Sequence, residues 1–119
     1  MRPMQRPKFY YNELFKMNYY FCLGWDAVVF NKYLKKNFNH ETDCSGKAGK
    51  SLLVEADQGR IIIIWVRSVK DLSVIAHECV HAAYWTLNAI GIDARNDDAE
   101  TLSYVVENLF SKCIKYAKA

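Results

Sequence analysis

Residues 61–81 read IIIIWVRSVKDLSVIAHECVH, and this stretch predicts a strand followed closely by a helix. Its first six residues form the longest apolar run in the chain. A short run rich in β-branched residues is typical of a strand that is covered on both faces. Asp71 or Ser73 can cap the helix, which is expected to run to Ile90, and Gly91 is a good C-terminal stop.

Toward the N-terminus, residues 51–56 predict a second strand, which a turn at residues 57–59 joins to the apolar run. Two strands with so short a connection form a hairpin. Earlier still, residues 18–23 are the best strand within an aromatic-rich segment. Asp26 can then cap a helix that ends at about Asn37.

Toward the C-terminus, a last helix is expected to start near Asp97, because its neighbouring acidic residues suit a helix N-terminus. The predicted fold is therefore α+β, with a small mixed or antiparallel sheet packed against the helices, which we expect on one face of the sheet. The length of 119 residues allows a single domain, 1–119, of which residues 1–8 read as a flexible arm.

Composition excludes several classes of protein. The chain is 51% hydrophobic and 24% charged, which indicates a globular rather than a disordered protein. The net charge of +3 comes from scattered basic residues, so we expect no nucleic-acid partner. No apolar run approaches the length of about 20 residues that a membrane span requires, so we expect no membrane partner.

The N-terminal sequence lacks the apolar core of a signal peptide, and we therefore expect a cytoplasmic protein with reduced thiols. Cys22, Cys79 and Cys113 sit in apolar contexts and are expected in the core. Cys44 follows polar residues in a predicted loop and is expected to be the exposed thiol.

The pattern H-E-x-x-H occurs once, at His77, Glu78 and His81, within the predicted helix. Residues four apart lie one turn apart on the same helix face, so the two imidazoles can bind one Zn²⁺. Glu78 can take a proton from a zinc-bound water and return it to a leaving amine. The simpler interpretation is two surface histidines that happen to be four apart, but the flanking apolar residues favour a motif that is at least partly buried.

A catalytic zinc site needs a third protein ligand and one open position. Glu100 is the preferred ligand, because it lies within the last helix and a Glu side chain reaches further than an Asp. Asp98 stays open as an alternative, because helical phase puts it on the apolar stripe that faces the core. Asp97, Glu107 and His40 are further candidates.

The segment HECVH, followed by Gly91 and by DDAETLSY at residues 97–104, resembles small gluzincin-type metallopeptidases. It is particularly similar to short zinc peptidases encoded by bacteriophages and, more distantly, to the ImmA/IrrE-type peptidase core. The resemblance covers roughly residues 51–110 and implies a minimal zincin-like domain. It implies that Zn²⁺ is held by His77, His81 and Glu100, with Glu78 as the general base and acid.

The resemblance also implies that strand Ile61–Val66 is the edge that binds an extended protein or peptide substrate. The function expected from these points is a zinc-dependent metallopeptidase that acts in a bacterial host cytoplasm. A homo-oligomer or a host or virion protein partner stays open. No residue stands out as the stabiliser of the oxyanion, for which Tyr84, Tyr104 and Arg95 are candidates.

A second function stays open beside the peptidase. The same fold could serve as a binding protein, such as a phage factor for host takeover or anti-defence or a virion component, in which zinc is structural or vestigial. A fourth protein ligand, such as His40 or Cys44, would favour structural zinc.

Overall fold

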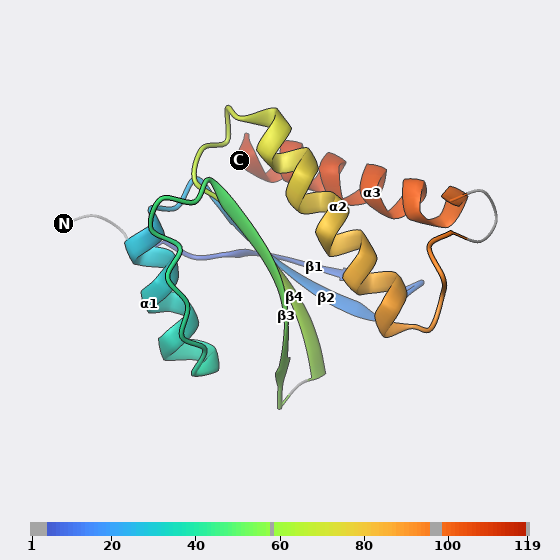
Figure 1. Cartoon of the computed structure of the whole chain (residues 1–119), viewed down its shortest axis with the longest axis horizontal. Helices are drawn as coiled ribbons and strands as arrows, with labels where there is room; N and C mark the ends of the chain where they lie inside the picture. Colours follow the sequence, from blue (N-terminus) through green and yellow to red (C-terminus); the bar gives the residue numbers. More distant parts are fainter. Residues whose placement is uncertain (1–4, 58, 96–98, 119) are drawn as a thin grey trace.

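The computed structural model describes residues 5–57, 59–95 and 99–118, which form a four-stranded mixed sheet and three helices (Figure 1). The predicted α+β fold is thereby confirmed. Residues 1–4 of the predicted arm lie outside the described residues, and Lys8 at its end begins the first strand. In chain order the elements are β1 (Lys8–Asn12), β2 (Met17–Leu23), α1 (Ala27–Phe38), β3 (Gly49–Ala56), β4 (Gly59–Val66), α2 (Leu72–Ala89) and α3 (Glu100–Ala117).

The strand order in the sheet is β1-β2-β4-β3. β3 and β4 pair antiparallel, as the predicted hairpin requires, and β1 and β2 pair in the same way. β2 and β4 are parallel neighbours, which is possible because α1 and β3 return the chain between them. β1 is an addition to the prediction, which assigned only one strand to the aromatic-rich segment.

The prediction that Ile61–Val66 is an edge strand is wrong. These six residues lie in β4, which pairs with β2 on one side and with β3 on the other. Both rows of backbone hydrogen-bonding groups are therefore occupied within the sheet, so no further strand can add there. The expectation that this run is covered on both faces is confirmed, because all six residues are fully buried. The edge beside β4 is β3, which has one strand neighbour.

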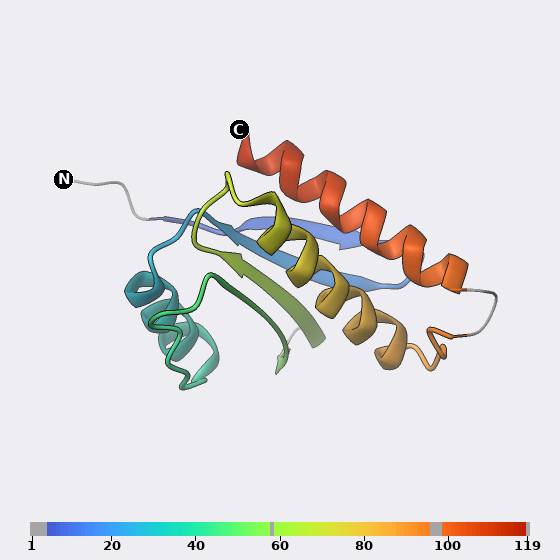
Figure 2. The same cartoon turned by 45° about the horizontal axis from the view of Figure 1, so that its top comes forward.

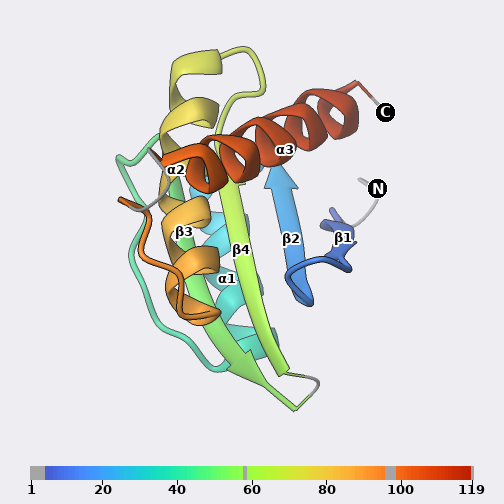
Figure 3. The same ribbon diagram turned by 90° about the vertical axis from the view of Figure 1, so that its right-hand side faces the viewer.

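The helices cover both faces of the sheet, and the expectation that they lie on one face is wrong (Figures 2 and 3). The side chains of β4 belong alternately to two cores, one on each face of the sheet, because successive side chains of a strand point to opposite faces. Ile62 and Ile64 contact α2 and α3, whereas Ile63 and Trp65 contact α1. On the α1 side the rings of Phe30 and Trp65 are stacked at 5.0 Å.

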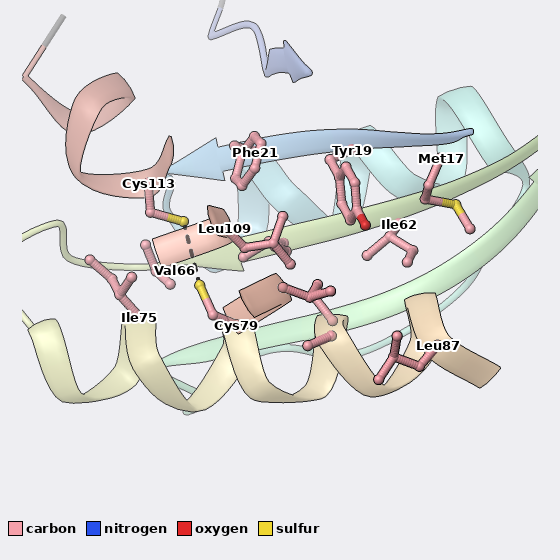
Figure 4. Close-up of a cluster of buried hydrophobic side chains, with 14 residues drawn as sticks. Met17, Tyr19, Phe21, Ile62, Val66, Ile75, Cys79, Leu87, Leu109 and Cys113 are labelled. Atoms are coloured by element: carbon pink, nitrogen blue, oxygen red, sulfur yellow. Dashed lines mark hydrogen bonds between the residues drawn. The ribbon is translucent and has the colours of Figure 1, made fainter. Parts of the chain in front are cut away.

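The core under α2 and α3 is built from large apolar side chains and two thiols (Figure 4). The sulfur atoms of Cys79 on α2 and Cys113 on α3 lie 3.8 Å apart within it, and both thiols are free. Cys22 is buried against α1, so the three thiols expected in the core are there. The expectation that Cys44 is exposed is wrong, because its polar neighbours face solvent while its own side chain completes the α1 core.

In the part of the chain that the structure describes, no helix combines the length and the apolar character that crossing a bilayer requires.

Candidate active site

α2 is held in place by its cap and by its inner side. The Asp71 side chain accepts a hydrogen bond from the backbone N–H of Val74, which fixes the first turn. Because successive helical positions turn by about 100°, His77 and His81 point away from the core, and both are exposed. The inner side is buried against the sheet and α3 through Ile75, Cys79, Ala82, Ala83, Thr86 and Leu87.

The two histidine side chains converge on one another. Their Nε2 atoms lie 3.1 Å apart, and the rings are 4.7 Å apart at a steep angle. Two nitrogen ligands of one tetrahedral Zn²⁺, each about 2.0–2.1 Å from the metal, are separated by about 3.3 Å. The pair therefore fits two ligands of one zinc ion. Without a metal, the same distance allows one ring to donate an N–H to the other.

Glu78 differs from both histidines in its surroundings, because it is only 6% exposed. It lies between α2 and the start of β3, where the Ser51 hydroxyl contacts it twice. The Oγ atom of Ser51 is 3.0 Å from Oε1 of Glu78 and 2.8 Å from its backbone carbonyl oxygen. The expectation of a partly buried motif therefore applies to Glu78 and Cys79, and not to the histidines.

Gly49 makes the approach of Glu78 to the sheet possible. A Cβ atom at this position would lie 3.0 Å from Cγ of Glu78 and 2.9 Å from both Cγ1 of Val74 and the backbone oxygen of Trp65. Contacts this short with one backbone oxygen and two side-chain carbons leave no room for a larger residue. Glycine at the start of β3 thus lets the first half of α2 lie close against the edge strand.

Glu100, the preferred third ligand, is the first residue of α3 and is exposed. It lines a hollow of about 600 Å³ near the C-terminal end of α2, together with Leu14, Ile90 and Tyr104. Among the described residues, no three His, Cys, Asp or Glu side chains are close enough to hold a metal, so Glu100 does not join the histidine pair in this structure. The assignment of Glu100 as a ligand stays a prediction.

The alternative ligands fall in different places. Asp97 and Asp98 lie outside the described residues. His40 follows α1, which covers the opposite face of the sheet from α2. Glu107 lines a shallow groove of about 510 Å³ between α2 and α3, opposite Ala76 and Val80, the residues that precede the two histidines.

Of the candidates for oxyanion stabilisation, Tyr84 and Arg95 line one hollow at the C-terminal end of α2, and Tyr104 lies apart from them. Tyr84 continues the exposed side of α2, three residues after His81. Arg95 is engaged by Asp93: its guanidinium donates at 3.1–3.2 Å to both carboxylate oxygens, and these bonds lower the pKa of Asp93. Tyr104 lines the hollow at Glu100 rather than the histidine side of α2. Tyr84 is thus the candidate nearest to the histidines along the helix.

Sequence reasoning missed Ser51 and Gly49. Both come from the first residues of β3, and their contacts with Glu78 span more than two dozen positions of sequence. A serine or glycine at a strand start has no pattern that distinguishes it from an ordinary turn residue. Only the packing of β3 against α2 brings Ser51 and Gly49 to the motif.

The chain matches no protein-family model, and comparisons with curated proteins and with solved structures find no match. The resemblance to gluzincin peptidases therefore rests on the motif and its spacing alone.

Proposed function

We propose that the protein is a zinc-dependent metallopeptidase of the small gluzincin type. One observation carries the proposal: two exposed histidines whose Nε2 atoms are 3.1 Å apart stand beside a buried glutamate that the edge strand holds. Surface histidines that merely happen to be four apart need neither this convergence nor a neighbouring glutamate that is buried against the edge strand.

The roles of the residues follow from their chemistry. His77 and His81 would hold the metal through Nε2. Zn²⁺ bound there would act as a Lewis acid: it would polarise a carbonyl group and lower the pKa of a water molecule toward neutral pH. Glu78 would accept a proton as general base and deliver it to the amine of the departing peptide as general acid. Its position at the junction of α2 and β3 keeps the carboxylate largely out of bulk water.

The substrate class that suits this site is an extended peptide or an unfolded protein segment. β3 has a strand neighbour on one side only, and its first residues lie directly beside Glu78. A peptide can add to such an edge through main-chain hydrogen bonds, which recognise backbone rather than sequence. We therefore transfer the substrate-binding role from Ile61–Val66 to Gly49–Ala56.

The third ligand is proposed to come from the N-terminal half of α3 or the residues before it. Glu100 remains the first choice, and Glu107 competes because its groove adjoins the turns that carry the histidines. The zinc affinities of Glu100→Gln and Glu107→Gln distinguish the two candidates. The variant that removes the true ligand should bind zinc more weakly, and the other variant should bind it as tightly as wild type does. If both keep full affinity, the ligand is neither, and Asp97→Asn and Asp98→Asn become the next variants.

The function is tested by zinc analysis together with the Glu78→Gln variant and fluorescein-labelled casein as a probe substrate. We expect the wild type to bind zinc and to release labelled peptides. Glu78→Gln should keep the metal and lose cleavage by at least about 100-fold, because the amide cannot accept the proton. Equal cleavage by wild type and Glu78→Gln would contradict the proposed role of Glu78.

A second function is supported by exposed apolar side chains around the histidines. Val80, Tyr84 and Trp85 are 39%, 50% and 40% exposed on the same helix, and such surfaces often mark protein contacts. The same site would then bind a host or virion protein, with zinc as a structural element. A partner that is bound equally by wild type and Glu78→Gln, and is never cleaved, would favour this second function. Origin from a bacteriophage and action in the host cytoplasm remain parts of the proposal.

A further inference from the structure

The contact between Ser51 and Glu78 assigns a further residue to the site. We propose that Ser51 is a positioning residue, which fixes the Glu78 carboxylate at the edge strand so that one of its oxygens stays free to handle a proton. This inference rests on the proposed function, because the exact place of the carboxylate matters only if it takes part in chemistry.

The hydroxyl of Ser51 is itself firmly placed. Ser51 pairs with Ile64 in the β3–β4 ladder, and Ile64 is fully buried under α2 and α3. A slip of the ladder by one residue would turn Ile64 out of that core, so the register is strongly fixed. The Oγ atom is therefore held by the sheet and not by a mobile loop.

The single proton of this hydroxyl is shared between two acceptor oxygens of one residue of α2. Oγ is 2.8 Å from the backbone carbonyl oxygen of Glu78 and 3.0 Å from its Oε1 atom. The backbone contact fixes where the helix turn lies against β3, and the side-chain contact fixes where the carboxylate ends. Because both contacts use the same atom, the carboxylate is tied to the sheet and to its own helix turn at once.

Gly49 completes the arrangement on the same face of β3, two residues before Ser51. The absence of a side chain there leaves the space that the Cγ atom of Glu78 occupies. Glycine therefore accommodates the stem of the glutamate while serine binds its tip.

This arrangement has a chemical consequence. A carboxylate has two oxygens, and Ser51 contacts Oε1. Oε2 is then the oxygen left to accept and deliver a proton. A glutamate without this contact would sample several rotamers, and only a fraction of them would present an oxygen in the productive place.

The test compares zinc-loaded wild type, Ser51→Ala, Ser51→Thr and the control Ser111→Ala, which alters an exposed serine of α3. With labelled casein as substrate, Ser51→Ala should lower kcat by about 10- to 100-fold and leave KM within about twofold. Ser51→Thr should restore most of kcat, because it keeps the hydroxyl and suits a strand. Zinc content should be the same in all four proteins.

Crystal structures of the same zinc-loaded proteins provide a readout that does not need activity. In Ser51→Ala the Glu78 carboxylate should leave its place beside β3, and in Ser51→Thr it should remain. A carboxylate that stays in place in Ser51→Ala, or a kcat equal to that of wild type, would overturn the proposal.

The two proposals fail in different ways. If wild type binds zinc but cleaves nothing, the proposed function fails, while the crystal structures still decide whether Ser51 positions Glu78. If wild type cleaves and both Ser51 variants match it, the function stands and the role of Ser51 is refuted. If Ser51→Ala and Ser51→Thr lose activity and thermal stability together, the serine has a structural role only, and the proposal is refuted as well.

Discussion

The inner and outer sides of α2 differ in what determines their residues. The inner side is buried, contacts β3, β4 and α3, and carries small or apolar side chains apart from the hydroxyl of Thr86. The outer side carries His77, His81, Tyr84 and Trp85, all of which are exposed. Packing explains the inner side completely and gives no reason for two converging histidines on the outer side.

Glu78 lies at the boundary between these two sides, and this position is informative. A carboxylate that is only 6% exposed would not be selected for packing, since an alanine or leucine buries more favourably there. It is nevertheless supplied with a hydroxyl partner from β3. A buried polar group with a dedicated partner, next in sequence to a pair of converging histidines, is what the proposed site accounts for and packing does not. Four predictions test this contrast in terms of stability.

The largest effect is expected on the inner side, from Ile75→Ala. Ile75 is fully buried, so the substitution removes apolar contacts and leaves a cavity. We expect a loss of about 2–5 kcal/mol in the free energy of unfolding, measured by urea denaturation. Val80→Ala on the outer side serves as the matched control and should change it by no more than about 0.5 kcal/mol. Similar losses in both variants would remove the contrast between the two sides.

A smaller effect is expected from Thr86→Val, which changes one buried hydroxyl. Thr86 donates to the carbonyl oxygen of Ala82 at 2.9 Å and accepts from the Tyr19 hydroxyl at 2.6 Å. Valine keeps the shape and leaves the Tyr19 hydroxyl buried without this partner, at a cost of about 1–3 kcal/mol. Thr86→Val combined with Tyr19→Phe should lose less than the sum of the two single substitutions, which a double-mutant cycle measures. Strict additivity would show that the two hydroxyls are not coupled.

A pH-dependent effect follows from the same tyrosine. Burial raises the pKa of Tyr19 to about 12 from its usual 10.0, so the folded protein keeps the phenol neutral where the unfolded chain ionises it. The contribution of the neutral Tyr19 phenol to the free energy of unfolding is complete below pH 10 and is lost as the pH rises toward 12. The stability difference between wild type and Tyr19→Phe should therefore shrink over this range, as measured by urea denaturation at each pH. A difference that is constant with pH would contradict a buried neutral phenol.

The smallest effect is expected on the outer side, from His77→Ala and His81→Ala in the metal-free protein. Both side chains are exposed, so each substitution should alter the free energy of unfolding by no more than about 0.5 kcal/mol. Thermal unfolding in the presence of a chelator measures this. A loss of 2 kcal/mol or more would mean that the histidines support the fold, and the simplest reason to assign them a metal would disappear.

Much of the fold could be predicted because its signals are local. The β3–β4 hairpin, the capping of α1 by Asp26 and of α2 by Asp71, and the buried run of isoleucines all depend on neighbouring residues. The order of the strands depends on contacts that are distant in sequence. The parallel pairing of β2 with β4 makes β4 central, and no pattern within Ile61–Val66 reveals this.

The same limit applies to the candidate site. The spacing of His77 and His81 fixes their shared helix face, so their convergence could be predicted from sequence. The partner of Glu78 could not be predicted, because Ser51 contacts it only through the packing of β3 against α2. The burial of Cys44 was missed for a related reason: its loop is polar, yet a hydrogen bond from its backbone N–H to Asn31 at 3.1 Å helps to hold it against α1.

The central claim is that the outer side of α2 is a metal site, and the most direct test is the zinc content of the purified protein. Elemental analysis after dialysis against metal-free buffer should find about one Zn²⁺ per chain in the wild type. His77→Ala and His81→Ala, folded as judged by circular dichroism, should each contain none above background. Retention of zinc in both folded variants, or its absence from wild type that has been given zinc, would contradict the account.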